Sequence, residues 1–215
     1  MAASTTGKMV RLKPAARSQS SSSKGRVWNR SARRERLDEE KLSGEALYQD
    51  FFTYEPGTRF DAISMMGVME DLSDYDRVTS RVVNWLKPGG RIYLDFATER
   101  TRFSTASFIT KYIWPGTFRK VYLPELIASI WKSPLELIGL YNDRRNYHLW
   151  AKKVHERWVE RKTDALKEVS EEHWRMFRVL FAAAESIMGH PSHLASAQRM
   201  VLELPDIPAR SSAAK

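Results

Sequence analysis

The sequence predicts an α/β fold, with a mainly parallel sheet, an antiparallel last strand and a helical cap insertion. Three observations lead to this class. An apolar run, an amphipathic helix, a glycine turn and a second apolar run follow one another between residues 60 and 96. Two long amphipathic helices at about 146–164 and 171–188 then interrupt this alternation, and the last apolar segment alternates apolar with polar residues. A strand, a crossover helix and a second strand form the repeating unit of a parallel sheet.

The composition divides the chain into a basic leader and a neutral body. The net charge is +9, from 35 basic and 26 acidic residues. Residues 1–34 hold nine of the basic residues and no acidic ones, so 26 of each remain in the body. Low hydrophobicity and a serine-rich stretch at 18–23 predict disorder in the leader. We therefore expect a disordered leader at 1–34, a folded domain at 35–205 and a disordered tail at 206–215.

The leader allows three interpretations: an unstructured tail, an organelle transit peptide, or a nucleic-acid contact. The neutral body gives the third little support, so no nucleic-acid partner is expected. No apolar run approaches the roughly 20 residues that span a bilayer. The absence of cysteine excludes disulfides, a thiolate nucleophile and cysteine-based zinc sites. We expect a cytoplasmic protein without a transmembrane segment, unless the leader directs it to an organelle.

The first elements of the body are short. Alternating charges from Ser31 to Leu42 predict an exposed helix with Ser31 as its N-cap. Residues 46–49 are β-prone, and Phe60–Met66 is a mostly apolar run of strand length. Continuous apolarity predicts a strand covered on both faces, as in a parallel sheet.

The next elements follow from periodicity and turn residues. Apolar residues at three- and four-residue spacing predict a helix over 72–86, which ends at Lys87-Pro88-Gly89-Gly90. Arg91–Phe96 is the next strand. Later elements are a helix at about 122–132, a strand at 135–141 and a last strand at 198–204, whose alternation predicts an antiparallel edge strand.

Six segments between Ala46 and Pro205 carry a resemblance to a known family. They are Gln49-Asp50-Phe51, FDAISMMGVMEDLSDY at 60–75, NWLKPGGRIYLDF at 84–96, FITKYIWPG at 108–116, Asp143-Arg144-Arg145-Asn146-Tyr147 and RMVLELP at 199–205. With these six segments in this order, the chain resembles the class I S-adenosylmethionine-dependent methyltransferases, and within them the cyclopropane-fatty-acid-synthase-like family. The resemblance implies a Rossmann-like sheet, S-adenosyl-L-methionine as cofactor, and methyl transfer to a small or lipid-like apolar acceptor.

The resemblance also implies a cofactor site beyond the carboxyl ends of the strands. Asp50 would accept a hydrogen bond from the adenine amino group, and Phe51 would support the ring. Met66 and Gly67 would lie at the cofactor, where glycine permits close backbone approach. The alternative for the first pair is a solvated turn aspartate beside a core phenylalanine.

The implied catalytic residues are Glu70 and Tyr147. An alkene that accepts a methyl group becomes a carbocation, and a carboxylate such as Glu70 would stabilise it and remove a proton, directly or through a bicarbonate. The alternative is a helix-start residue that interacts with the macrodipole. Where the family has two histidines, this chain has Asp71 and Asp95. These departures argue against cyclopropanation in particular, not against methyl transfer.

The resemblance places the acceptor pocket between the sheet and the cap. Tyr112 and Trp114 lie in the segment that covers this pocket, and aromatic faces stabilise cationic intermediates. The alternative for the aromatic residues is ordinary core packing. His190 and His193 are too isolated for a metal site, and no metal is expected. The other implied pocket residues are Tyr141, Asp143 and Arg144.

One family feature is missing from the sequence. No two of its glycines have Gly-x-Gly spacing, and the leader holds no long apolar strand. The chain is therefore expected to be a truncated methyltransferase domain without the central strands, which would leave a core face open. This leaves three alternatives: marginal stability, a partner chain or second copy that covers the face, or an incomplete gene model. The alternative to an enzyme is a non-catalytic remnant that acts as a binding or partner subunit.

Overall fold

The computed structural model describes residues 10–13, 39, 41, 47–72, 74–101, 107–114, 118–193 and 195–206. The chain forms two compact units, Met1–Gly57 and Thr58–Lys215. In the first unit, β1 (Val10–Lys13) pairs in parallel with β2 (Leu47–Asp50). The strand expected at 46–49 is thus confirmed as β2.

The first unit differs from expectation at β1. This strand lies inside the leader for which the composition predicts disorder. A short strand can form there because its backbone hydrogen bonds are completed by β2, which is distant in sequence. The rest of the leader, the tail from 207 and most of the helix expected at 31–42 lie outside the described residues.

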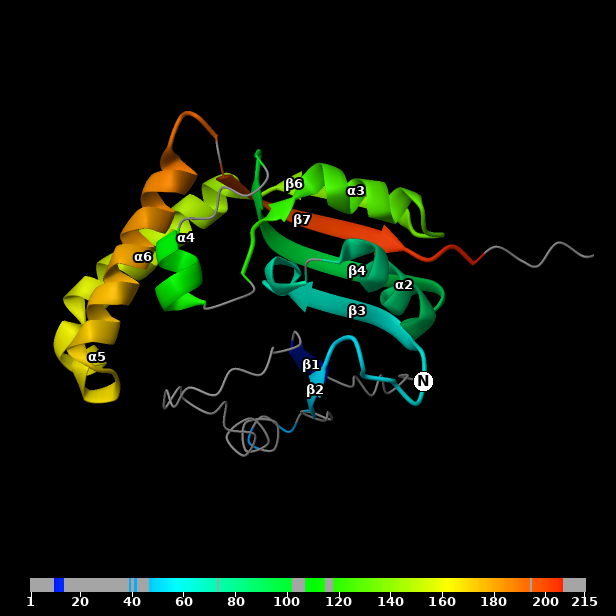
Figure 1. The fold of residues 1–215 in the computed structure, drawn as a ribbon, viewed down its shortest axis with the longest axis horizontal. Coiled ribbons are helices and arrows are strands. Elements are labelled where there is room, and N and C mark those ends of the chain that lie inside the picture. Colours follow the sequence, from blue (N-terminus) through cyan, green and yellow to red (C-terminus); the bar gives the residue numbers. More distant parts are fainter. Residues whose placement is uncertain are drawn as a thin grey trace, which may run out of the picture. The chain divides into compact units, whose positions relative to one another are not determined.

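The second unit is built on a mixed sheet (Figure 1). Its strand order is β3-β4-β7-β6, with β5 beside β4. β4 (Leu86–Glu99) runs parallel to β3 (Phe60–Met66) and to β5 (Val121–Tyr122), whereas β7 (Ala195–Glu203) runs antiparallel to both β4 and β6 (Glu136–Asn142). The predicted α/β class with an antiparallel last strand is confirmed.

The connection from β3 to β4 follows the predicted pattern. Helix α2 (Tyr75–Trp85) begins after Asp74, whose carboxylate accepts a hydrogen bond of 3.0 Å from the Arg77 N–H. After the helix, Gly89 has a φ of 74°, in the left-handed region that glycine adopts without strain. The residues of the expected glycine turn lie within β4, which begins at Leu86 rather than at Arg91.

The core lies between the sheet and two helices. Helix α3 (Leu123–Trp131) packs beside α2, and a hydrogen-bonding contact of 3.0 Å between the hydroxyl oxygens of Thr79 and Ser129 joins them. The side chains that pack together here are apolar and buried, and removal of their surface from water stabilises the unit. They are Met65, Ile92, Leu94 and Leu202 from the sheet and Val78, Val82, Leu126 and Ile130 from the helices.

Two expectations about strand environment were wrong. β3 was expected to be covered on both faces, but within it only Met65 is buried, and Met66 is 65% exposed. Among the described residues β3 pairs only with β4, and α2 and α3 cover only the face that carries Met65. β7 was expected at an edge, but it lies between β4 and β6. Apolar and polar residues alternate in β7 because only one face of the sheet is well covered. An interior antiparallel strand can show this alternation just as an edge strand does.

The cap consists of three helices after β6. They are α4 (Arg144–Glu160), α5 (Lys162–Glu168) and α6 (Glu171–Gly189), and they lie beyond the end of the sheet to which β3 points (Figure 1). The indole N–H of Trp158 donates to the Trp174 carbonyl at 3.0 Å, and that of Trp174 donates to the Trp158 carbonyl at 3.2 Å. The predicted cap insertion is present. No helix in the described part of the chain has the length and apolarity to cross a membrane.

Candidate functional site

A glycine turn opens the site at the carboxyl end of β3. The Gly67 N–H donates a hydrogen bond of 2.8 Å to the Asp95 carbonyl on β4. Its φ is 58°, and a Cβ added there would meet nothing within 4 Å. The backbone thus borders open space in a conformation that favours glycine, which fits the predicted close approach of a ligand.

Glu70 follows in the short 3-10 helix η1 (Met69–Asp71) and is buried, with 7% of its surface exposed. Its Oε1 accepts a hydrogen bond of 2.7 Å from the Ala97 N–H, while Oε2 is buried and has no hydrogen-bond partner among the described residues. Burial raises the pKa of Glu70 to about 7, although the Ala97 N–H opposes this shift. The negative charges of Asp71 and Asp95 raise the pKa further. Such a carboxyl group can accept or donate a proton near neutral pH.

Tyr147, on the cap helix α4, contacts the sheet at the carboxyl end of β3 and β4. Its hydroxyl donates a hydrogen bond of 2.9 Å to Oδ1 of Asp95, the residue opposite Met66 in the register of β3 and β4. Burial, followed by the bond to Asp95 and the nearby carboxylates, raises the pKa of Tyr147. The hydroxyl therefore stays protonated at neutral pH. The structure thus brings the two predicted catalytic residues, Glu70 and Tyr147, to Asp95.

Asp143 anchors the beginning of α4. Its buried carboxylate pairs with Arg199 on β7, and one of the two hydrogen bonds measures 3.1 Å from Nη2 to Oδ1. This guanidinium group holds the pKa of Asp143 below its usual range. The Arg199 guanidinium also lies 5.5 Å from the ring centre of Tyr141. Sequence reasoning missed Arg199 as a site residue. It lies directly opposite Asp95 in the β4–β7 register, and no local sequence pattern indicates this pairing.

The predicted aromatic pocket residues are not core residues. Tyr112 is 50% exposed, Trp114 42% and Tyr141 54%. Tyr112 belongs to the π-helical turn η2 (Ile109–Ile113), and Trp114, the residue after it, stacks on Phe118 at 4.6 Å. The alternative of ordinary core packing is wrong for these three, while their contact with an acceptor stays a prediction.

The predicted adenine residues belong to the first unit. Asp50 Oδ1 accepts hydrogen bonds from the N–H groups of Phe52 at 2.8 Å and Thr53 at 3.2 Å, which makes a local turn. Phe51 is buried, and its ring meets that of Phe52 edge-on at 5.3 Å. This geometry fits the alternative of a turn aspartate beside a buried phenylalanine, and the adenine contact stays a prediction.

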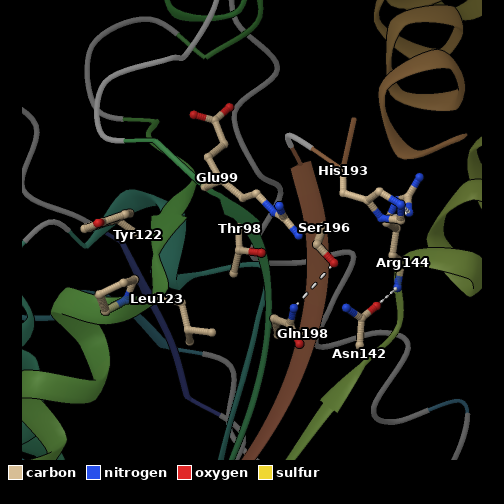
Figure 2. A pocket seen from close by; sticks show the side chains of 11 residues that line it. Thr98, Glu99, Tyr122, Leu123, Asn142, Arg144, His193, Ser196 and Gln198 are labelled. Atoms are coloured by element: carbon tan, nitrogen blue, oxygen red, sulfur yellow. Dashed lines mark hydrogen bonds between the residues drawn. The ribbon is translucent and has the colours of Figure 1, made fainter. Parts of the chain in front are cut away.

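A pocket of about 320 Å³ lies at the carboxyl end of β4 (Figure 2). Of the five predicted pocket residues, only Arg144 lines it. Thr98, Ser196 and Gln198 also line it, and sequence reasoning missed them. Their signal was weak, because polar residues near strand ends are common. Among the described residues no group of three or more His, Asp or Glu side chains is placed to hold a metal ion.

Comparison with known proteins identifies the family. Residues 23–192 match the model of the family described as mycolic acid cyclopropane synthetase. The chain belongs to this family. No curated protein matches the sequence. Cyclopropane synthetase membership agrees with the order of the six segments noted in the sequence.

Solved structures share the fold of this cyclopropane synthetase family member. The cyclopropane synthase MmaA2 from Mycobacterium tuberculosis is 16% identical, with a TM-score of 0.70 over 79% of this chain and 64% of that one. Mycolic acid cyclopropane synthase CmaA1, complexed with SAH and CTAB, is 15% identical, with a TM-score of 0.66 over 75% and 61%. The [4+2]-cyclase SpnF is 15% identical, with a TM-score of 0.62 over 81% and 62%. This chain thus spans less than two thirds of each of these structures.

Proposed function

We propose that this protein transfers the methyl group of S-adenosylmethionine to a small or lipid-like apolar acceptor, with Glu70 at the reacting centre. The observation that supports this proposal is the buried Glu70 carboxyl group. One of its oxygens accepts a hydrogen bond from the Ala97 N–H, and the other has no partner among the described residues. Membership of the cyclopropane synthetase family and the CmaA1 complex with SAH support the choice of cofactor.

The residues at the end of β3 fit a cationic ligand. Asp71 and Asp95 are close enough for their charges to raise the pKa of Glu70, so the site concentrates negative charge. The open space at Gly67 would admit a ligand against the backbone. S-adenosylmethionine is a sulfonium cation that supplies an electrophilic methyl group when bound. Gly67 and Met66 would hold it here.

The protein's own groups would then handle charge and protons. The Ala97 N–H fixes Oε1 of Glu70, so that the orientation of Oε2 is set before an acceptor arrives. An acceptor that gains a methyl group at an alkene becomes a cation, which the Glu70 carboxylate would stabilise before Oε2 takes its proton. Tyr147 would hold the Asp95 carboxylate beside this site. Tyr112 and Trp114 would present aromatic faces to the apolar acceptor.

Calorimetry with S-adenosylmethionine and S-adenosylhomocysteine at millimolar concentration tests the cofactor. The proposal predicts measurable heat with both ligands, and absence of heat with either would overturn it. Transfer of radiolabelled methyl groups to vesicles of dioleoyl phosphatidylglycerol then tests the reaction. We expect Glu70→Gln to lower turnover by about a hundredfold or more while cofactor affinity is retained. Glu136→Gln, an exposed carboxylate on β6, is the matched control and should not change either quantity.

A binding role without catalysis is the second candidate. It is favoured by the absence of Gly-x-Gly spacing and by Asp71 and Asp95 at the family's histidine positions. The exposed β3 would then adjoin a partner chain or a second copy. No heat with either cofactor, together with a dimer or a heteromeric complex in sedimentation, would favour this candidate.

A further inference from the structure

The cap separates its charges along its first two helices. Residues 144–155, the first part of α4, include four basic residues and no acidic ones, whereas residues 156–172 include four basic and six acidic residues. Helix α6 packs beside α4, and its last turns, residues 178–189, include one acidic residue, Glu185, whose carboxylate contacts the His155 ring at 2.9 Å. The end of the cap that follows β6 is therefore positively charged.

Three of the four cations in this first part of α4 are exposed. Arg145 and Lys152 form no ion pair with any described residue. Lys153 pairs with Glu156 at 2.8 Å, and such a surface pair contributes little because water screens both charges. The fourth cation, Arg144, is half-buried and lines the pocket at the end of β4. The three exposed side chains are therefore available to a partner with negative charge.

Two large apolar side chains are exposed among these cations. Leu149 is 50% exposed and Trp150 is 54% exposed. Residues three or four positions apart lie on the same side of a helix, so Leu149 shares a face with Arg145 and with Lys153. An indole is apolar over its rings and polar at its N–H, which suits Trp150 to a boundary between water and hydrocarbon. We name Arg145, Leu149, Trp150, Lys152 and Lys153 the α4 patch.

The α4 patch combines the two features that bind a helix to the surface of an anionic bilayer. Negative headgroups attract its cations, and apolar side chains between the cations enter the boundary between headgroups and acyl chains. Duplex nucleic acid would attract the same cations but offers Leu149 no apolar layer. We propose that the α4 patch binds the surface of a membrane that contains anionic lipids. This binding goes beyond methyl transfer and needs no cofactor.

The α4 patch adjoins the edge of the sheet where Glu70 lies. The ring centre of Trp150 is 5.8 Å from that of Tyr147, whose hydroxyl donates a hydrogen bond of 2.9 Å to Asp95. The excess of acidic residues at 156–172 is repelled by negative headgroups, which favours an orientation with the first part of α4 toward the membrane. A bound membrane would therefore lie beside the carboxyl end of β3.

Co-sedimentation of the full chain with lipid vesicles tests the proposal. Vesicles of dioleoyl phosphatidylglycerol should bind the protein at least about tenfold more tightly than vesicles of dioleoyl phosphatidylcholine, and added salt should weaken this binding. Lys152→Gln should raise the Kd for the anionic vesicles about fivefold. Lys167→Gln, which removes the same charge from α5 in the acidic part of the cap, is the matched control and should change the Kd by less than about twofold.

The apolar part of the α4 patch has its own matched pair of variants. Trp150→Ser should raise the Kd for anionic vesicles about tenfold. Trp131→Ser removes a tryptophan on α3 that is 81% exposed, and it should change the Kd by less than about twofold. The thermal midpoint of each variant shows whether it is folded.

Fluorescence quenching by brominated phosphatidylglycerol locates the contact without removing the apolar side chain. Quenching of tryptophan emission in the full chain should fall clearly in Trp150→Phe, because its indole is the one placed at the lipid. Trp131→Phe should retain the quenching. Equal quenching in both variants would overturn the proposal.

Three outcomes of the binding measurements would also overturn the proposal. Equal affinity for anionic and zwitterionic vesicles would remove the role of the cations. Vesicle binding that folded Lys152→Gln and Trp150→Ser retain in full would place the contact elsewhere, for example in the basic residues of 1–34. Tighter binding to a DNA duplex, weakened by the same two variants, would reassign the α4 patch to nucleic acid. Co-sedimentation contains no S-adenosylmethionine, so failure here is distinguishable from failure of the methyl-transfer proposal.

Discussion

Tyr147 on α4 donates a hydrogen bond of 2.9 Å to the Asp95 carboxylate on β4. This bond joins the first turns of the cap to the edge of the sheet where Glu70 lies. Asp95 stands where the resemblance places a histidine, and here it serves as the acceptor for the tyrosine. The change of residue type is therefore accompanied by a partner that keeps the carboxylate in a defined position.

Removing the Tyr147 hydroxyl should loosen this junction. Tyr147→Phe leaves Asp95 without its donor, and we expect a loss of about 1 kcal/mol in the free energy of unfolding. Methyl transfer should fall as well, if Asp95 supports the site as proposed. Urea unfolding and the vesicle assay measure the two effects. Tyr112→Phe, on the half-exposed η2, is the control, and an equal loss of stability in both variants would contradict the assignment.

The raised pKa of Glu70 predicts a stability effect with a definite sign. Its folded pKa of about 7 lies above the ordinary 4.5, so the folded state binds more protons between these values. Stability from this group is therefore full below pH 4.5 and is lost as the pH rises toward 7. Glutamine does not ionise, so Glu70→Gln removes this loss. The free energy of unfolding of the variant minus that of the wild type should therefore be about 1 to 3 kcal/mol larger above neutral pH than at acid pH.

Urea unfolding of both proteins at about pH 5 and about pH 8 measures this difference. A difference in unfolding free energy between variant and wild type that is the same at both pH values would contradict the raised pKa.

The same pKa predicts the pH dependence of the proposed reaction. Glu70 must be ionised to take a proton, so turnover with vesicles of dioleoyl phosphatidylglycerol should rise with pH and level off above about 7. Initial rates across this range give the midpoint. A rate that falls through neutrality would instead assign Glu70 the role of proton donor.

The pair between Asp143 and Arg199 should contribute to stability. Asp143→Asn removes a buried charge and leaves Arg199 with a weaker acceptor, and we expect a loss of about 2 kcal/mol. Asp61→Asn is the matched control, because its pair with Lys87 is solvent-exposed and should contribute less to stability than the pair of Asp143. Chemical unfolding of both variants at neutral pH checks the contrast, and equal losses would argue against an anchoring role for Asp143.

Much of the fold could be predicted because its signals are local. The apolar run at 60–66 and the helix that follows depend on neighbouring residues, and both elements lie where the pattern indicated. The strand expected at 91–96 is also present but extends over Leu86–Glu99. The burial of β3 could not be read in this way. Apolar residues can fill a strand whether or not both faces are covered, and coverage depends on which distant segments pack there.

The sequence by itself determined the strand–helix–strand unit, the antiparallel last strand, the cap helices and the family, because periodicity, turn residues and motif order are properties of neighbouring residues. It also indicated Glu70 as the residue to test. Only the tertiary structure decided that Oε2 of Glu70 is left without a partner among the described residues, and that Thr98 faces Ser196. Burial and strand register join residues far apart in the chain, and no local pattern encodes the solvent or the partners that each side chain finally meets.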